Sequence, residues 1–432
     1  MNRLQKVLYN AQRRIPQADA PGFRATDGAS ALTARLGSLE ELVWLYDQTS
    51  PFHFVMGATF MGAGTAAPWR EVLDALQRRH PLLRVRIERD AIAYPKFVTD
   101  EAARIPLRMG DADIGWAGEM SRELQISFDH RNAALIRAVV CGDTTGSTLL
   151  LTVHHAIADA IALTWVFRDV LLLLSGQNLE PLPVPVSQDE VLGNALRAVP
   201  EKPARTLPQA TASDASFRER LQVQHRGLSR DLTAEIAEKA RSESTTVFGV
   251  LSAAAILAGR SLSNRWRTEA LRFLCPVSSR RHAEFQEAVR AYFNIVPLHL
   301  APEIGSDLWD LARYCKAAVL PAQSREGAKG IAKQLVGLLE AGPSPAAVSY
   351  FMHAHFASHG SLSSVGAIPY PTRARDIELT AIWGPALSTG VDGEQYLGAV
   401  TLNGKLHLTN TSSLPISGLL STMESVLARA CL

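Results

Sequence analysis

The chain has 432 residues, of which 47% are apolar and 20% are charged, as in an ordinary globular protein. Its 44 lysines and arginines nearly balance 42 aspartates and glutamates, and the net charge of +2 argues against a nucleic-acid-binding surface. The longest apolar run, Val247 to Ala258, is far shorter than a membrane span of about 20 residues. The sequence therefore predicts neither a nucleic-acid partner nor a membrane span.

The N-terminal segment and the cysteines bear on the cellular compartment. Met1 to Arg14 is polar and basic and lacks the apolar run of a secretory signal. The four cysteines lie far apart and form no CxxC pair, which predicts neither a zinc site nor a disulfide framework. We therefore expect a cytoplasmic protein with reduced thiols.

Helices and strands are predicted to alternate in the first part of the chain. Ser38–Tyr46 begins with a capping serine and predicts a helix, and Trp69–Arg79 has the apolar spacing of a second helix. His53–Gly62 is rich in aromatic and β-branched residues, and Leu82–Glu88 alternates between apolar and charged residues, so both predict strands. This alternation indicates an α/β fold.

Two adjacent histidines and an aspartate follow this region at the junction of a strand and a helix. The apolar run Leu149–Thr152 predicts a buried strand, and Ile161–Phe167 has the spacing of a helix packed on a core. His154, His155 and Asp159 lie between them. Reactive side chains are often presented at such element ends.

Several interpretations of these residues remain open from the sequence alone. His155 could be a general base because imidazole titrates near neutral pH, with Asp159 orienting or balancing it. His155 and Asp159, four residues apart, could instead hold a metal ion on one helix face, although no third ligand is nearby. The histidines could also be satisfied core residues near a helix start.

A proline-rich stretch divides the chain. Prolines punctuate a polar, alanine-rich composition between Gln177 and Phe217, which predicts a crossover with one short helix near Glu190–Val199. We therefore expect an N-terminal subdomain over 1–176, a linker over 177–217 and a C-terminal subdomain over 218–432.

The second part of the chain repeats the mixture of helices and strands. Leu228–Arg230 predicts the approach to a strand, Thr233–Arg241 a helix, and Thr245–Leu257 an almost wholly apolar helix that must be buried. Leu271–Arg281 predicts a strand that runs into a polar turn, and Tyr396–Thr409 predicts a hairpin around an Asn-Gly turn.

A second histidine cluster has the pattern His-x-His-x-x-x-His. It consists of His353, His355 and His359, and no firm fourth ligand accompanies it. We interpret these as incidental histidines and expect no metal site.

The stretch His154-His155-x-x-x-Asp159 resembles the HHxxxDG motif of the condensation-domain and CoA-dependent acyltransferase superfamily. The chain has Ala160 where the family usually has glycine. Upstream, Arg79–Arg84 resembles the family's RHPxLR segment.

The resemblance continues in the second part of the chain. Pro276–Arg280 resembles the family's PVxxR segment, whose arginine pairs with the aspartate of the motif. Tyr292–Leu298 is similar to the family's GxxxNxxPL strand, with Asn294 matching and Val289 or Arg290 in place of the glycine. Leu362–Pro369 is similar to the SNxGxxP segment, with Ser364 replacing the asparagine.

The resemblance implies a fold and a role for each matched residue. The fold would be two chloramphenicol-acetyltransferase-like α/β sandwiches around a central tunnel. His155 would be the general base, and His154 would point into the fold. Asp159 would pair with Arg280, or failing that Arg281. The tunnel would be lined by Ala160, Asn294 and Ser364.

The function implied is that of a free-standing acyltransferase of natural-product or lipid biosynthesis. It would move an acyl group from a thioester to a hydroxyl or amine of a small-molecule acceptor. It would hold no bound cofactor and would use acyl-CoA or acyl-phosphopantetheine as cosubstrate, the latter on an acyl or peptidyl carrier protein. The alternative is a catalytically silent relative that docks or scaffolds a biosynthetic assembly line.

Overall fold

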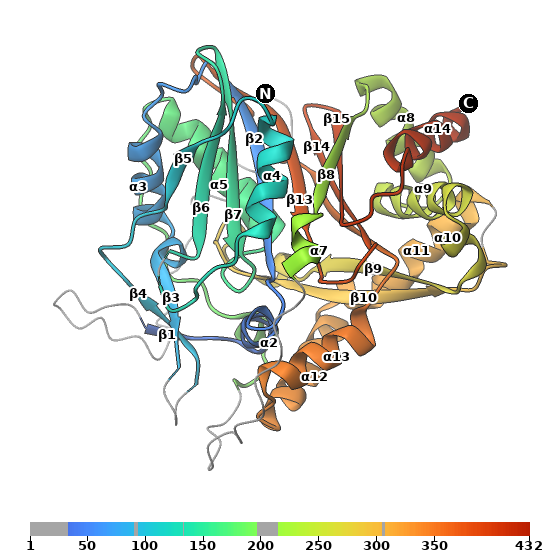
Figure 1. Ribbon diagram of the computed structural model, residues 1–432, viewed down its shortest axis with the longest axis horizontal. Coiled ribbons are helices and arrows are strands. Elements are labelled where there is room, and N and C mark those ends of the chain that lie inside the picture. Colours follow the sequence, from blue (N-terminus) through green and yellow to red (C-terminus); the bar gives the residue numbers. More distant parts are fainter. Residues whose placement is uncertain (1–32, 90–93, 133, 197–214, 305–306) are drawn as a thin grey trace, which may run out of the picture. The chain divides into compact units, whose positions relative to one another are not determined.

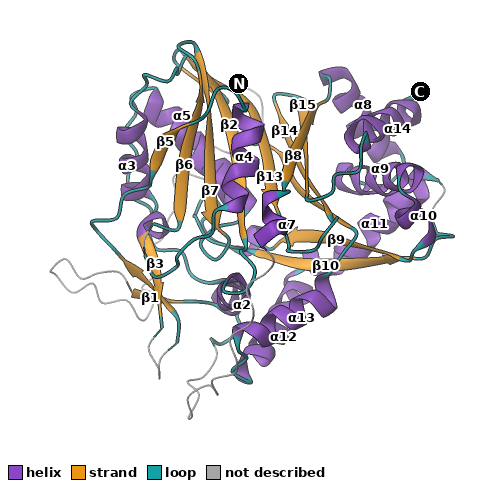
Figure 2. Ribbon diagram, in the orientation of Figure 1, coloured by secondary structure: helices purple, strands orange, loops and turns teal. Residues whose placement is uncertain are grey.

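The computed structural model describes residues 33–89, 94–132, 134–196, 215–304 and 307–432. The expectation for Met1 to Arg14 lies outside these residues, as does the end of the short helix predicted near Glu190–Val199. Figures 1 and 2 show two mixed β-sheets flanked by helices. We call the described residues up to 196 the N-terminal half and those from 215 the C-terminal half.

The first sheet consists mainly of strands from the N-terminal half. In spatial order its strands are β12 (Arg373–Ala374), β13 (Ile377–Leu387), β2 (His53–Met61), β7 (Gly146–His154), β6 (Ile136–Gly142) and β5 (Leu107–Met109). Helices α3 (Trp69–Arg79) and α5 (Ala160–Leu174) cover one face, and α4 (Gly115–Gln125) covers the other (Figure 1). Because β7 is buried on both faces, its central residues Leu149, Leu150 and Leu151 are all apolar and do not alternate with polar ones.

The second sheet belongs to the C-terminal half. In spatial order its strands are β10 (Phe293–Leu300), β9 (Leu271–Ser278), β11 (Gly360–Ala367), β14 (Gln395–Leu402), β15 (Lys405–Ser412) and β8 (Gln222–Gly227). Helices α9 (Val247–Leu262), α11 (Leu308–Gln323) and α14 (Leu419–Cys431) share one hydrophobic core with this sheet. This burial explains why α9 is apolar almost throughout.

The remaining elements lie around these two sheets. A small sheet has the order β1 (Thr33–Arg35), β4 (Lys96–Thr99) and β3 (Val85–Glu88). Helix α2 (Ser38–Asp47) packs against α12 (Arg325–Glu340) and α13 (Pro345–Phe356). The other elements are short or peripheral: η1 (Pro81–Arg84), α6 (Gln188–Leu192), α7 (Ala215–Glu219), α8 (Arg230–Ser242), α10 (Asn264–Thr268) and η2 (Arg280–His282).

Three sequence predictions differ from the structure for local reasons. The strand predicted over Leu82–Glu88 begins only at Val85, because Pro81 starts a 3-10 turn. The strand predicted at Leu228–Arg230 lies earlier, as β8, since Ser229 caps helix α8 with its hydroxyl. The short helix predicted near Glu190–Val199 is α6, which ends at Gly193 in a left-handed conformation.

Two findings concern features predicted to be absent. The four cysteines are free. No single helix among the described residues has the length and apolar composition to cross a membrane; α8 and α9 meet those criteria only as a pair, which is bent by 105°.

Strand β13 connects the two halves in a way that the sequence did not indicate. It follows α13 and β11 of the C-terminal half but pairs with β2 of the first sheet over Phe54–Met61. Strand β14 lies so close to β13 that a Cβ on Gly398 of β14 would lie 2.4 Å from the carbonyl oxygen of Pro385 of β13. Glycine is therefore required at Gly398 by the close approach of two backbones.

We expect Gly398→Ala to lower the free energy of unfolding by about 1–3 kcal/mol, the usual result of adding a methyl group to a filled site. The matched control is Gly330→Ala in α12, where a Cβ would meet nothing within 4 Å. That change should stabilise the chain by roughly 0.5–1 kcal/mol because alanine favours helix interiors. Denaturant unfolding midpoints measure both, and an unchanged midpoint for Gly398→Ala would contradict the packing described.

Candidate active site

His154 ends β7, and His155 begins the turn that leads into α5. Strand β7 pairs with β2 as far as His154, opposite His53. The backbone N–H of His155 then donates to the carbonyl of Phe52 at 3.2 Å. Asp159 is the N-cap of α5. The predicted order of strand, histidine pair and helix is confirmed, and β2 fixes where the strand ends.

His154 points into the fold. Its side chain is fully buried, and its Nδ1 accepts a hydrogen bond from the N–H of Ala156 at 3.1 Å. The ring proton of the neutral form is therefore on Nε2, which lies 3.3 Å from a carboxylate oxygen of Asp47. Burial raises the pKa of the Asp47 carboxyl, but His154 and the N–H of Phe52 outweigh it, and the net shift is downward. His154 thus connects the motif to α2.

His155 lies among three phenylalanine rings. Its ring stacks on Phe52 at a centroid distance of 5.3 Å and contacts Phe54 at 4.8 Å and Phe293 at 4.7 Å. Its Nδ1 lies 2.9 Å from the carbonyl oxygen of Ala158. Because a carbonyl can only accept, the proton is on Nδ1 and the lone pair is on Nε2. Nε2 has no hydrogen-bond partner within the described part of the chain.

Burial also sets the protonation state of His155. Desolvation lowers its pKa from 6.5 to about 4, against the smaller opposing effects of the Ala158 carbonyl and Asp159. The imidazole is therefore neutral near pH 7. A neutral ring with one fixed N–H and one free lone pair is the form that a general base requires.

Asp159 is enclosed by donors and has no role as a free carboxylate. Its Oδ1 accepts the N–H of Ala162 at 2.7 Å, which caps α5. Nη2 of Arg280 lies 2.9 Å from Oδ1 and 2.8 Å from Oδ2, and the N–H of Tyr292 donates to Oδ2 at 2.9 Å. This geometry indicates that Asp159 holds α5 to the C-terminal half.

Arg280 makes the contact with Asp159 that the resemblance implied. It is 2% exposed, whereas Arg281 is exposed to solvent. Beyond Asp159, its guanidinium donates to the carbonyls of Gln286 at 2.9 Å and Ala288 at 2.7 Å. One arginine therefore joins the start of α5 to the segment that precedes β10.

Arg290 forms a second buried ion pair that sequence reasoning missed. It lies in the stretch where the family's glycine is absent, and it is 2% exposed. Its guanidinium pairs with Glu40 of α2, with Nη2 2.8 Å from Oε2, and Nη1 also contacts the carbonyl of Pro185. The only signal in the sequence was an arginine in an otherwise apolar segment, Ala288–Phe293.

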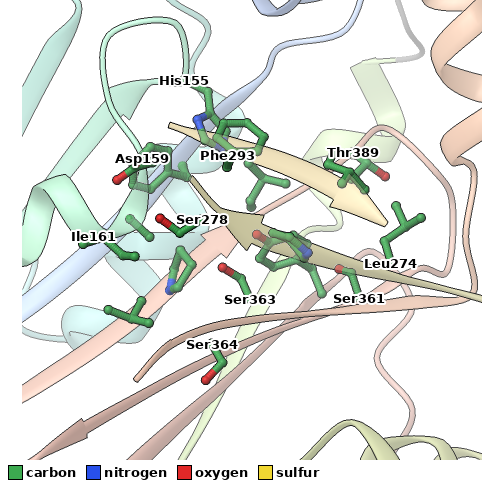
Figure 3. Close-up of a pocket in the computed structure, with 18 of the residues that line it drawn as sticks. His155, Asp159, Ile161, Leu274, Ser278, Phe293, Ser361, Ser363, Ser364 and Thr389 are labelled. Atoms are coloured by element: carbon green, nitrogen blue, oxygen red, sulfur yellow. The ribbon is translucent and has the colours of Figure 1, made fainter. Parts of the chain in front are cut away.

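A cavity lies between the two sheets beside His155 (Figure 3). Its cavity volume is about 80 Å³. The wall around His155 is apolar. Residues with hydroxyl groups line the other side: Ser278, Ser361, Ser363, Ser364 and Tyr396 of the second sheet, and Thr389, which follows β13. Figure 3 shows Ser361 and Ser363 across the cavity from His155.

Two of the three residues predicted to line the tunnel do line the cavity. Ala160 and Ser364 contribute to its wall. Ala160 is the first residue of α5 and has no positive φ, so glycine is not needed there for its conformational freedom. The prediction for Asn294 is wrong: Phe293 and Ile295 face the cavity, and side chains alternate along a strand. Asn294 instead accepts a hydrogen bond from Gln188 at 3.4 Å.

The second histidine cluster does not converge. His353 contacts the carbonyl of Ser349 at 2.8 Å, and His359 lies 3.0 Å from a carboxylate oxygen of Glu269. No group of three or more histidine, cysteine, aspartate or glutamate side chains in the described ranges is placed to hold a metal ion.

The fold and the histidine motif together define a class of protein. The family model described as "Condensation domain" matches residues 47–334, and the chain belongs to that family. Its condensation and acyltransferase relatives share the arrangement of two sheets with helices.

Three further comparisons show which proteins the chain is similar to. The AMB antimetabolite synthetase AmbB of Pseudomonas aeruginosa is 27% identical over 365 residues, covering 76% of this chain and 28% of the synthetase. The structure of polyketide synthase associated protein 5 from Mycobacterium tuberculosis has a TM-score of 0.63 at 17% identity and covers 92% of this chain and 98% of that one. TRI3 trichothecene 15-O-acetyltransferase from Fusarium sporotrichioides has a TM-score of 0.61 at 13% identity and covers 97% and 99%.

We expect Asp159→Ala to lower the melting temperature as well as any activity. Removing one partner of a buried ion pair leaves the other charge uncompensated and typically costs about 3–5 kcal/mol. Arg131→Ala is the control, because Arg131 is exposed and pairs with Asp129 at the surface; it should change stability by no more than about 0.5 kcal/mol. An Asp159→Ala variant that is inactive but fully stable would instead assign Asp159 to the chemistry.

Proposed function

We propose that this chain is an acyltransferase that moves an acyl group from a thioester to a hydroxyl or amine of a small-molecule acceptor. The observation that carries the proposal is the neutral His155, with its Nδ1 proton fixed by Ala158 and its Nε2 lone pair available beside the cavity. The chain's membership of the condensation-domain family supports the same chemistry.

In the proposed reaction His155 acts through Nε2. It takes the proton of the acceptor hydroxyl or amine as that group attacks the thioester carbonyl and forms the new C–O or C–N bond. The C–S bond then breaks, and the leaving sulfur takes that proton from His155 and departs as a thiol. The ring does not need to rotate, because the Ala158 carbonyl and the phenylalanine rings already fix its plane. The sequence has no G-x-S-x-G elbow, so the scheme uses no acyl-enzyme.

The oxyanion formed in this attack needs donors close to the cavity wall. The first N–H groups of a helix have no acceptor within the helix. At the start of α5 the N–H of Ala162 is taken by Asp159, and Ala160 and Ile161 both line the cavity. We assign their N–H groups as the oxyanion donors.

The donor in this proposal is acyl-CoA or the acyl-phosphopantetheine of a carrier protein. The family supports a carrier protein as the kind of partner involved. Intact-mass analysis of a panel of CoA and carrier-bound thioesters, with and without the protein, tests the proposal directly. Consumption of at least one donor with formation of an acylated acceptor is the expected result.

The alternative is a catalytically silent protein that docks or scaffolds an assembly line. This alternative is suggested by three departures of the sequence from the family motifs: Ala160, Ser364 and the missing glycine before Asn294. The geometry of His155 favours catalysis, since a scaffold would not need a free lone pair in a lined cavity. Inertness toward every thioester in the panel would favour the scaffold.

We expect His155→Ala to lower kcat by about 10²–10⁴-fold, the usual contribution of a general base. The fold should be retained, because the ring makes one hydrogen bond, to its own turn. His154→Ala should mainly destabilise the chain, since it removes the buried contact with Asp47. His353→Ala, at an exposed position on α13, is the control for both. Normal turnover by His155→Ala together with a folded but inactive His154→Ala would reverse the assignment.

We expect kcat/KM to be insensitive to pH across the usual titration range of histidine. The pKa of His155 is about 4, so its ring stays in the basic form from pH 8 down to about pH 5. Protonation removes the lone pair of Nε2 only at lower pH. A pH–rate profile between pH 5 and 8 measures this. A tenfold fall in kcat/KM between pH 6.5 and 5.5 would contradict the burial that lowers the pKa.

A further inference from the structure

A second hollow, larger than the cavity beside His155, lies between β10 and the helices α11, α12 and α13. Its cavity volume is about 730 Å³. Ligand sites in proteins typically have volumes of about 300–1,000 Å³, so the hollow can accept a sizeable group. We call it the helical groove.

The helical groove has the chemistry of a hydrocarbon site. Leu335 and Leu338 of α12, Phe351 of α13 and Ala318 of α11 line it, and none of its described lining residues is an aspartate, glutamate or lysine. Its one arginine, Arg272, is occupied by the carbonyls at the end of α13, at 3.1 and 3.2 Å. Its other polar lining side chains are His299, Gln334 and His355, and the remaining lining residues are apolar or glycine, so the groove offers much apolar surface to bury.

The helical groove adjoins the cavity beside His155 and is separated from it by the side chains of Ile295 and Phe356. Ile295 of β10 lines both. A narrow space of about 20 Å³ lies between them; it shares Phe52, Leu274 and Ile295 with the cavity, and Ile295 and Phe356 with the groove. A chain that begins at His155 can thus pass Ile295 and Phe356 if these two side chains give way.

We propose that the helical groove holds the alkyl chain of the acyl donor, so that the enzyme selects medium- or long-chain acyl groups. This inference rests on the proposed function. The thioester carbonyl carbon must lie in the cavity for His155 to act. The acyl chain is bonded directly to that carbon and therefore begins beside His155. Its hydrocarbon matches the groove, whereas the acceptor enters the reaction through a polar hydroxyl or amine.

The test compares acetyl, hexanoyl and dodecanoyl thioesters of pantetheine with one fixed acceptor. A buried methylene is worth about 0.8 kcal/mol, so kcat/KM should rise about fourfold for each methylene that enters the groove. Ala318→Trp fills the groove from α11 and should lower the dodecanoyl-to-acetyl ratio at least about tenfold while the acetyl reaction is unchanged.

Two further variants keep this test independent of folding. Ala317→Trp adds the same side chain to the exposed neighbouring position on α11, outside the groove, and should leave the ratio unchanged. Ala354→Trp fills the groove from an exposed position on α13 and should reproduce the effect of Ala318→Trp. An unchanged ratio in both groove variants overturns the inference. So does an equal loss for all donors with a raised KM for the acceptor, which would place the acceptor in the groove.

Binding of S-dodecyl and S-ethyl pantetheine, measured by calorimetry, separates this inference from the proposed function. Tighter binding of the dodecyl thioether that is lost in Ala318→Trp and kept in Ala317→Trp supports the groove even if no thioester is turned over. Equal binding of the two thioethers overturns the inference even if acetyl transfer is observed.

Discussion

The buried pair of Asp159 and Arg280 is the interaction on which the rest of the site depends. Two opposite charges in a protein interior are stable only if hydrogen bonds satisfy most of their remaining groups. Here the carboxylate accepts from a helix N-terminus, from Arg280 and from the N–H of Tyr292, while Arg280 also donates to carbonyls ahead of β10. The pair therefore fixes α5 of one half against β9 and β10 of the other, and with them the positions of His155 and Phe293.

The same closure of the two halves determines the character of His155. Phe54 and the preceding Phe52 come from the N-terminal half and Phe293 from the second sheet, and together they desolvate the ring. Desolvation makes the histidine a weaker base, because its pKa falls, but it also keeps the lone pair free at every pH near neutrality. His155 therefore has a lower proton affinity than a free histidine, but its protonation state is constant near neutral pH and its ring has a single orientation.

The sequence predicted those parts of the site that depend on local pattern. The buried strand and the helix on either side of the two histidines follow from apolar spacing, and the partner Arg280 followed from a resemblance in the motif that contains it. The orientation of Asn294 was not predictable, because a shift of one residue in strand register reverses the face that a side chain occupies. The pair Arg290–Glu40 joins positions 250 residues apart, and no local signal relates them.

Strand β13 has a consequence for how this chain can be made. It completes the first sheet next to β2, yet more than 300 residues of chain are synthesised between Phe54 and its partner Leu387. Until Leu387 has left the ribosome, β2 has an open edge with unpaired backbone groups, the kind of surface that recruits strands of other chains. Such non-local pairing is also slow to form. The first sheet is therefore expected to remain incomplete until most of the chain has been synthesised.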